Sequence, residues 1–331
     1  MIRIALDAMG GDFAPEVPVE GALAAAAELP ESCEIQLVGR QDEIRGVLSR
    51  HGATPDCVRI IDAPDVVGMG EKPLAAVRGK PRSSIGVALG LQKKGETDAF
   101  ISAGNTGAVM AASTILLGLH PGVERPAIGA LFPTGGQPVL VLDAGANVDC
   151  SPRELQGFAY IGAVYARDVL GRPNPKVGLL NIGEEEEKGN SAVKETHALL
   201  KHTTHFTFAG NVEGRDILSG VCDVVVCDGF VGNVVLKFYE SVERLFRSLL
   251  ERSMERPITE MPGMQDVFRI LDYSEYGGAP LLGIRGVSII CHGSSTPRAI
   301  KNAIHVALQS VQSQVSQHIG AEFAGGGEAV A

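Results

Sequence analysis

The 331-residue sequence contains no tryptophan, and its six cysteines include no CxxC pair. A chain of this length buries a sizeable core without disulfide bonds, so we expect reduced thiols, as in a cytoplasmic protein. Basic residues are also few: the sequence has 29 Lys and Arg residues and 39 Asp and Glu residues, which gives a formal net charge of −10. A nucleic-acid-binding protein needs a basic face, so the composition argues against that class.

Long hydrophobic runs are absent as well. The longest uncharged apolar stretch, Gly107 to Leu119, is interrupted by small and polar residues and is too short to cross a bilayer. Asp7 interrupts the first apolar run, so we expect no signal peptide. The sequence therefore predicts a cytoplasmic protein without a membrane-spanning segment, and it leaves peripheral association with a membrane open.

Several motifs of nucleotide, metal and hydrolase sites are missing. The sequence has no GxGxxG, no HExxH and no GxSxG. Gly90 and Gly95 have the spacing of a Walker loop, but Glu96 stands where that loop requires lysine. The remaining histidine cluster is expected to be a set of surface histidines rather than metal ligands: His197, His202 and His205. We therefore predict neither a metal ion nor another cofactor.

Short apolar segments alternate with helical patterns along most of the chain. This order predicts an α/β fold with a mostly parallel sheet covered by helices on both faces. We expect a single domain over residues 1–323 and a disordered, glycine-rich tail over 324–331. The predicted strands are 2–6, 34–38, 98–102, 139–143, 176–181, 206–209, 223–227 and 288–291, and the predicted helices are 15–28, 41–51, 107–117, 152–170 and 297–318.

One segment departs from this alternation. Residues 236–272 form a helical excursion between two strands, since Phe238, Val242, Leu245 and Leu249 fall on one helical face. Its basic and acidic residues are balanced, so any binding to lipid would depend on apolar insertion. Packing at a dimer interface is the alternative.

Glycine and asparagine occur together, adjacent or one residue apart, after four of the predicted strands. The four loops are 104–107, 143–147, 209–211 and 228–233. In open α/β sheets ligands bind at the carboxyl ends of the strands, and free N–H groups near helix N-termini favour an anion there. We therefore predict a site for a small anion such as phosphate, with these contacts: Asp7, Gly104, Asn105, Thr106, Asn147, Asn211, Gly229, Gly232 and Ser294.

Other polar residues are candidates for chemistry or docking. Lys188 follows a predicted strand beside a glycine, where it could hold phosphate as a point charge, and His292 also ends a strand. Together with Asp228 and Asn233, they are the predicted catalytic residues.

Lys72, Arg78, Lys80 and Arg82 form a basic cluster, which is either a solvated loop or a docking surface for an acidic partner.

Eight motifs occur in one order along the chain and resemble a single family. They resemble the bacterial acyl-carrier-protein:phosphate acyltransferases, the PlsX family of phospholipid synthesis, from residue 1 to about 315. The second half also distantly resembles phosphotransacetylases. The motifs are 7–12 (DAMGGD), 102–107 (SAGNTG), 143–147 (DAGAN), 181–190 (NIGEEEEKGN), 210–213 (GNVE), 228–233 (DGFVGN), 276–278 (YGG) and 292–295 (HGSS).

The resemblance implies a Rossmann-like three-layer fold related to isopropylmalate dehydrogenase and phosphotransacetylase, assembled as a homodimer. It implies conversion of acyl-[acyl-carrier protein] and inorganic phosphate to acyl phosphate and free carrier. The product would pass to a membrane glycerol-3-phosphate acyltransferase. The excursion at 236–272 is similar in position to the family's membrane-contacting helices.

Two other functions fit the same residues. One is a phosphotransacetylase-like enzyme that uses coenzyme A thioesters, and the other is a non-catalytic acyl-phosphate or lipid sensor. For an enzyme, we expect phosphate to attack the thioester directly, because the sequence offers no nucleophile elbow. Cys227 and Cys291 alternate in direction with Asp228 and His292, so we expect both thiols to face a packed layer.

Overall fold

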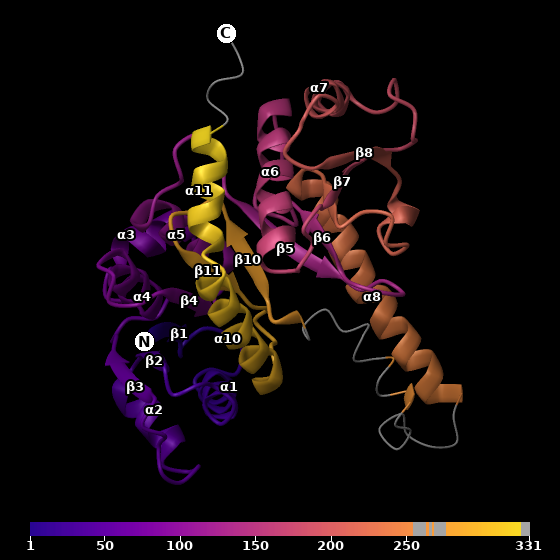
Figure 1. The fold of residues 1–331 in the computed structure, drawn as a ribbon. Helices are drawn as coiled ribbons and strands as arrows, with labels where there is room; N and C mark the ends of the chain where they lie inside the picture. The colour runs from indigo at the N-terminus through magenta and orange to yellow at the C-terminus, as the bar shows by residue number, and fades with distance from the viewer. Residues whose placement is uncertain (254–262, 265–266, 268–275, 326–331) are drawn as a thin grey trace. The chain divides into compact units, whose positions relative to one another are not determined.

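The computed structural model describes residues 1–331 except 254–262, 265–266, 268–275 and 326–331 (Figure 1). The chain divides into two compact units: unit 1 comprises Met1–Pro126 and Gly277–Ala331, and unit 2 comprises Ala127–Tyr276. Each unit contains its own strands and covering helices (Figure 1). A single domain over 1–323 stays a prediction.

Unit 1 contains a largely parallel sheet, in the order β3-β2-β1-β4-β11-β10. Its strands are β1 (Ile2–Asp7), β2 (Cys33–Gly39), β3 (Val58–Asp62), β4 (Ala99–Ser102), β10 (Ala279–Leu282) and β11 (Val287–Ile290). Only β10 runs antiparallel to its neighbour in this set, and Ile4 pairs with both Ile35 and Ala99. Strand β4 (AFIS) is buried over its whole length, as expected where helices cover both faces of a parallel sheet.

Seven helices of unit 1 cover this sheet or flank it in the described part of the chain. They are α1 (Glu16–Ala26), α2 (Gln41–Leu48), α3 (Pro73–Gly79), α4 (Ser84–Lys93), α5 (Thr106–Leu116), α10 (Pro297–Gln312) and α11 (Val315–Gly325). Helix α1 packs closely on α10, since a Cβ atom on Gly21 would lie 2.6 Å from Cβ of Ile300. Glycine is therefore required at this crossing.

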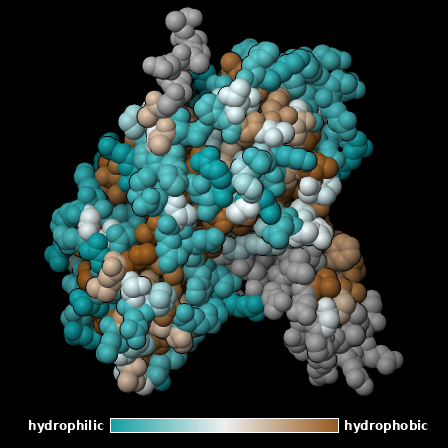
Figure 2. Space-filling model, in the orientation of Figure 1, coloured by the Kyte–Doolittle hydropathy of each residue, from teal (hydrophilic) through white to brown (hydrophobic). Residues whose placement is uncertain are grey.

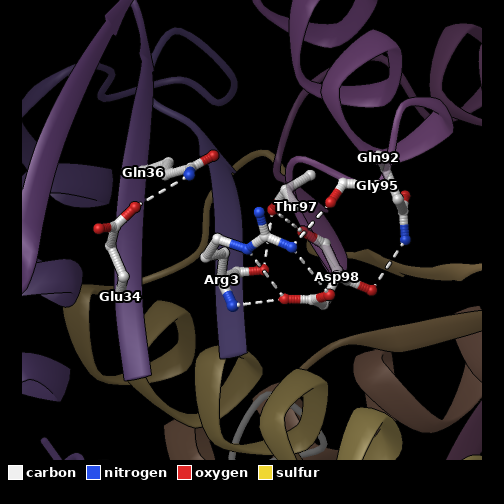
Figure 3. Close-up of polar contacts among 8 residues, drawn as sticks. Arg3, Glu34, Gln36, Gln92, Gly95, Thr97 and Asp98 are labelled. Carbon is white, nitrogen blue, oxygen red and sulfur yellow. Dashed lines mark hydrogen bonds and ion pairs between the residues drawn. The ribbon is translucent and has the colours of Figure 1, made fainter. Parts of the chain in front are cut away.

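A polar cluster joins the amino ends of three strands of unit 1 (Figure 3). The backbone N–H of Arg3 donates to Asp98 Oδ2 at 2.7 Å, and the Arg3 guanidinium donates to the Gly95 carbonyl at 2.8 Å. Gln92 donates to the carbonyls of Asp98 and Val287 at 3.1 and 2.9 Å. These bonds fix the register of β1, β4 and β11, whose opposite ends carry the candidate loops.

Unit 2 contains a second sheet, in the order β5-β6-β9-β7-β8. The strands are β5 (Ala127–Phe132), β6 (Val139–Leu142), β7 (Lys176–Leu180), β8 (Thr207–Val212) and β9 (Val224–Val226). Strand β5 is antiparallel to β6, and β6, β9, β7 and β8 are parallel. The helical elements are α6 (Pro152–Asp168), α7 (Ser191–Leu200), the 3₁₀ turn η1 (Gly214–Asp216) and α8 (Gly229–Ser253).

The predicted α/β class with a mostly parallel sheet is confirmed, and several boundaries differ. The last helix is two helices, α10 and α11, separated at Gln314, whose φ is +54°. Helix α11 extends to Gly325, so the predicted tail begins within a helix and its residues 326–331 lie outside the described residues. The predicted excursion begins inside α8, and most of its second half lies outside the described residues as well. No helix among the described residues has both the length and the hydropathy to span a membrane.

Candidate active site

The carboxyl ends of four parallel strands meet at one edge of the unit 2 sheet. Val226 pairs with both Leu142 and Leu179, and Leu180 pairs with Val212. Adjacent strands lie about 4.8 Å apart, so the four strand ends span roughly 15 Å. Helices α6, α7 and α8 begin after β6, β7 and β9, so their N-terminal N–H groups lie at this edge and favour a bound anion.

Asp143 organises the loop that follows β6. Its carboxylate is fully buried and accepts hydrogen bonds from five N–H groups. Oδ1 receives the backbone N–H of Ile128, Gly145 and Ala146 at 3.0, 3.1 and 3.0 Å. Oδ2 receives the backbone and side-chain N–H of Asn147 at 2.7 and 2.9 Å. Burial raises the pKa of Asp143, and these N–H groups act in the opposite direction.

The first turn of α8 lies directly against this loop. The Gly229 N–H donates to the Asn147 carbonyl at 2.7 Å, and Asp228 Oδ1 accepts from the Val231 N–H at 2.8 Å and so caps the helix. A Cβ atom on Gly229 would lie 2.6 Å from Asp143 Oδ2, and one on Gly232 would collide with the Asp143 carbonyl. Both glycines are therefore needed for the close approach of helix and loop.

Asn233 is the exposed polar residue of this first turn. Its Cβ and Oδ1 atoms each lie 3.4 Å from the position that a Cβ on Gly145 would occupy. The Asn233 amide therefore projects beside the loop held by Asp143. The structure thus brings the predicted residues Asn147, Asp228, Gly229, Gly232 and Asn233 together.

Lys188 lies in the neighbouring loop, which connects β7 to α7. Its side chain is exposed. The aliphatic part of this side chain lies over Gly183, since a Cβ atom on Gly183 would be 3.1 Å from Lys188 Cγ. Asn181 Nδ2 donates to the Lys188 carbonyl at 3.1 Å. Gly189 has a φ of +91°, and Asn190 caps α7 by accepting the Val193 N–H at 2.9 Å. The turn therefore presents the Lys188 ammonium group at the edge where α7 begins.

Asn211 occupies a different position from the predicted one. It lies within β8 rather than in a loop after it: the pairing of β7 with β8 shifts by one residue, with Ala209 as the extra residue on β8, and continues to Val212. The Asn211 side chain is 6% exposed, and its Nδ2 donates to the Glu185 carbonyl at 2.8 Å. Asn211 therefore holds the Lys188 loop against the sheet.

The other predicted residues lie in unit 1, at the carboxyl ends of β1, β4 and β11. Asp7 is buried, and its Oδ2 accepts from Ser102 Oγ at 2.7 Å, while Ser102 Oγ accepts the Gly104 N–H at 3.0 Å. Burial raises the pKa of Asp7, and its hydrogen bonds act in the opposite direction. Asp7 therefore supports the loop around Gly104 from beneath.

Asn105 is also engaged within the protein. Its Oδ1 accepts the Ala108 N–H at 3.0 Å, which caps α5, and its Nδ2 donates to the carbonyls of Met69 and Glu71 at 2.9 and 3.1 Å. Thr106, the next residue, is exposed at the start of α5. At this loop a ligand would meet Thr106 and the helix N-terminus rather than the Asn105 amide.

His292 and Ser294 form an exposed pair after β11. His292 Nδ1 lies 2.7 Å from Ser294 Oγ and accepts the Ser294 N–H at 3.2 Å. Because Nδ1 acts as an acceptor, the neutral ring carries its proton on Nε2. The Gly293 carbonyl accepts the Asp12 N–H at 2.7 Å, which joins this loop to the one after β1. Asp7, Gly104, Asn105, Thr106, His292 and Ser294 thus share one edge of unit 1.

The basic cluster lies on and around the short helix α3. Lys80 Nζ is paired with Glu71 Oε1 at 2.6 Å and with the Val66 carbonyl at 2.9 Å, so this residue has a structural role. Lys72, Arg78 and Arg82 are exposed. Three cations of the predicted docking cluster are therefore directed to solvent, and the fourth is not.

The described residues contain no group of His, Cys, Asp or Glu arranged to hold a metal ion. His202 and His205 are exposed, but His197 is not a surface residue: it is 6% exposed and its ring lies edge-on to Phe208 at 5.2 Å. Helix α7 turns His197 toward β8, which the sequence pattern did not indicate.

Both candidate thiols are buried. Cys227 Sγ lies 3.6 Å from the Asp143 carbonyl, and burial raises the pKa of Cys227 well above its usual range. Burial likewise raises the pKa of Cys291 to about 12. A thiol must ionise to act as a nucleophile, so neither is suited to form an acyl-enzyme.

We expect Cys227 and Cys291 to resist alkylation by iodoacetamide at pH 7.5 in the folded protein, because both stay protonated and buried. Mass spectrometry of digests should show both modified only after unfolding in urea, with the half-buried Cys57 modified earlier. Cys227→Ala and Cys291→Ala should retain substantial activity. Rapid labelling of either thiol, together with loss of activity in the matching variant, would contradict direct attack by phosphate.

A family model described as "Fatty acid synthesis protein" matches residues 2–318. The phosphate acyltransferase of Synechococcus elongatus is 49% identical over 326 residues, which cover 96% of this chain and 93% of that protein. The phosphate acyltransferase of Desulforamulus reducens is 50% identical over 319 residues, with 94% of each chain covered. Among solved structures, the EutD phosphotransacetylase of Staphylococcus aureus superposes with a TM-score of 0.63 over 94% of both chains at 14% identity, which shows a shared fold.

The family match covers nearly the whole chain, and the relatives are acyltransferases by name. The motifs that carried the resemblance in sequence lie at the carboxyl edges of the two sheets. The chain therefore belongs to the fatty acid synthesis protein family and, with its phosphate acyltransferase relatives, is an acyltransferase enzyme of lipid biosynthesis.

Proposed function

We propose that the chain transfers a fatty acyl group from acyl-[acyl-carrier protein] to inorganic phosphate. The observation that carries this proposal is the edge of unit 2, where three helices begin beside the exposed Lys188 and Asn233. This arrangement suits a small, highly charged anion. The phosphate acyltransferase relatives support the same reaction.

In the proposed reaction a phosphate oxygen attacks the thioester carbonyl carbon. A tetrahedral oxyanion forms, the C–S bond breaks, and the products are acyl phosphate and the carrier thiolate, which takes a proton from solvent. Phosphate is already a nucleophile and the thiol is a moderate leaving group, so the protein mainly holds the reactants and stabilises charge.

Lys188 would neutralise phosphate, and Asn233 would donate from its amide to phosphate or to the oxyanion. Asp228 would act by capping α8, and Asn147, Asn211, Gly229 and Gly232 would shape the site. At the sheet edge of unit 1, taken by itself, Thr106, Ser294 and His292 Nε2–H are the groups proposed to contact an anion, supported by Asp7, Gly104 and Asn105.

Release of carrier thiol from acyl-[acyl-carrier protein], followed with a thiol reagent, tests this function. We expect release that requires phosphate and yields acyl phosphate, which hydroxylamine traps as a hydroxamate. A preference for acyl-coenzyme A would favour the phosphotransacetylase-like alternative, and binding of acyl phosphate without turnover would favour a sensor. Absence of turnover with either thioester would overturn the enzyme proposal.

Docking of the acidic carrier is proposed at Lys72, Arg78 and Arg82. We expect Arg78→Glu with Arg82→Glu to raise KM for the carrier thioester roughly tenfold with little change in kcat, because surface charges steer encounter. Wild-type kcat/KM should fall as salt rises. The matched control is Lys93→Glu with Lys94→Glu, two exposed residues at the opposite end of α4 from Arg82. Equal, salt-independent rates for all three proteins would contradict a docking role.

We further propose that the enzyme works as a homodimer in the cytoplasm and associates reversibly with a membrane surface. Exposed apolar residues of α8, among them Leu245 and Leu249, support the membrane association, and the charge balance of this segment makes it depend on apolar insertion. At the membrane an integral glycerol-3-phosphate acyltransferase would consume the acyl phosphate.

A further inference from the structure

Unit 2 contains an apolar cavity of about 360 Å³ beside the proposed phosphate edge. One wall is α8, with five side chains between Val235 and Phe246, and the other is the connection from β8 to β9, with Ile217 and Leu218. Phe132 also lines the cavity, and its ring meets that of Tyr239 edge-on, with the ring centroids 5.4 Å apart. The volume lies within the roughly 300–1,000 Å³ of small-molecule sites.

The cavity extends away from the phosphate edge. Helix α8 begins at this edge, and the connection after β8 leaves the same edge at Val212 and returns to the start of β9. Phe132 pairs with Val139, the first residue of β6, so it marks the opposite edge of the sheet. Val235 lies two residues beyond Asn233, and Phe246 lies roughly 20 Å farther along the helix than Asn233.

We propose that this cavity holds the fatty acyl chain of the thioester, with the carbonyl at the first turn of α8 and the chain end toward Phe132. The inference rests on the proposed function and names the binding site of its substrate. A linear alkyl chain fits the chemistry, because the α8 wall exposes apolar side chains such as Phe238, at 70% exposure, and Phe246, at 56%. Continuity with the phosphate edge along one helix favours the chain over a second protein copy.

A cavity of finite length along α8 predicts a dependence on chain length. Each methylene removed from water should tighten binding about fourfold until the chain reaches Phe132 and Tyr239. Beyond that length the gain should stop. Without this cavity, an acyl chain left in solvent would show no such dependence.

The absence of tryptophan allows a direct test, since one substitution introduces the only indole of the chain. Leu218→Trp and Phe246→Trp place it at the cavity, and Leu245→Trp places it on α8 outside the cavity. The probe is 9,10-dibromostearate below its critical micelle concentration. We expect saturable quenching in the two cavity variants, reversed by stearate, and none in Leu245→Trp.

Turnover gives the second readout. We expect Val242→Trp, which adds bulk to the α8 wall of the cavity, to lower kcat/KM at least tenfold for palmitoyl-carrier protein and less than twofold for the hexanoyl thioester. Equal losses at both lengths, or no quenching in either cavity variant, would overturn the acyl-chain site. A smaller sedimentation coefficient for the cavity variants than for the wild type would assign this face to a second copy of the chain and would also overturn it. Quenching in the cavity variants, together with no thioester turnover by the wild-type protein, would instead overturn the proposed reaction while retaining a fatty-chain site.

Discussion

Replacing Asp143 with alanine is expected to abolish acyl transfer and to lower the free energy of unfolding by about 3–5 kcal/mol. The buried carboxylate accepts five N–H groups, four of them from the backbone, so the substitution leaves several buried donors without an acceptor. It also releases the loop that carries Asn147, which accepts the N–H of Gly229 at the start of α8. Urea unfolding and the thiol-release assay measure the two effects.

Two further variants separate the charge from the shape of this residue. Asp143→Asn keeps the size of the side chain but replaces one carboxylate oxygen with an NH₂ group. This group cannot accept the two N–H donors that Asp143 Oδ2 accepts, so we expect an intermediate loss of stability. Asp228→Ala removes a single capping bond and should cost about 1 kcal/mol. An Asp143→Ala protein within 1 kcal/mol of wild type would show that the loop does not depend on this carboxylate.

The strands that the sequence predicted best are short, uniformly apolar and followed within about three residues by glycine or asparagine. Val139 to Leu142 is an example, because burial on both faces of a parallel sheet requires such a run. The strands it missed have less regular patterns. Strand β3 reads VRIID and carries an exposed Arg59, while β5 and β10 lie where the alternation of strand and helix is interrupted.

The candidate site was predictable in its loops and not in the roles of particular side chains. Glycine together with asparagine identified three of the places where the chain leaves a sheet edge, but Asn211 lies within β8, where pairing with β7 continues past the irregularity at Ala209. Asp143 and Asn105 have extensive polar contacts because distant N–H and carbonyl groups converge on them. Which groups converge is a property of the fold rather than of the local sequence, and the same is true of the cavity beside Ile217.

We expect Lys188→Ala and Asn233→Ala each to raise KM for phosphate roughly 10–100-fold and to lower kcat, since a hydrogen bond to a charged group is worth about 1.5–3 kcal/mol. Both side chains are exposed, so the free energy of unfolding should change by less than about 0.5 kcal/mol. Initial rates of thiol release at varied phosphate concentration measure the first effect, and urea unfolding measures the second.

Two controls accompany this prediction. Lys188→Arg keeps the positive charge and should recover much of the activity, whereas Lys176→Ala removes an exposed lysine at the start of β7, at the opposite edge of the sheet, and should leave KM for phosphate unchanged. The charge of Lys188 matters in this interpretation because phosphate carries about two negative charges at neutral pH, like a phosphoryl group, and four exposed glutamates precede the lysine. Without the ammonium group these carboxylates would repel the substrate, so the loss should grow as salt is lowered. Wild-type phosphate kinetics in both Lys188→Ala and Asn233→Ala would place the phosphate site elsewhere.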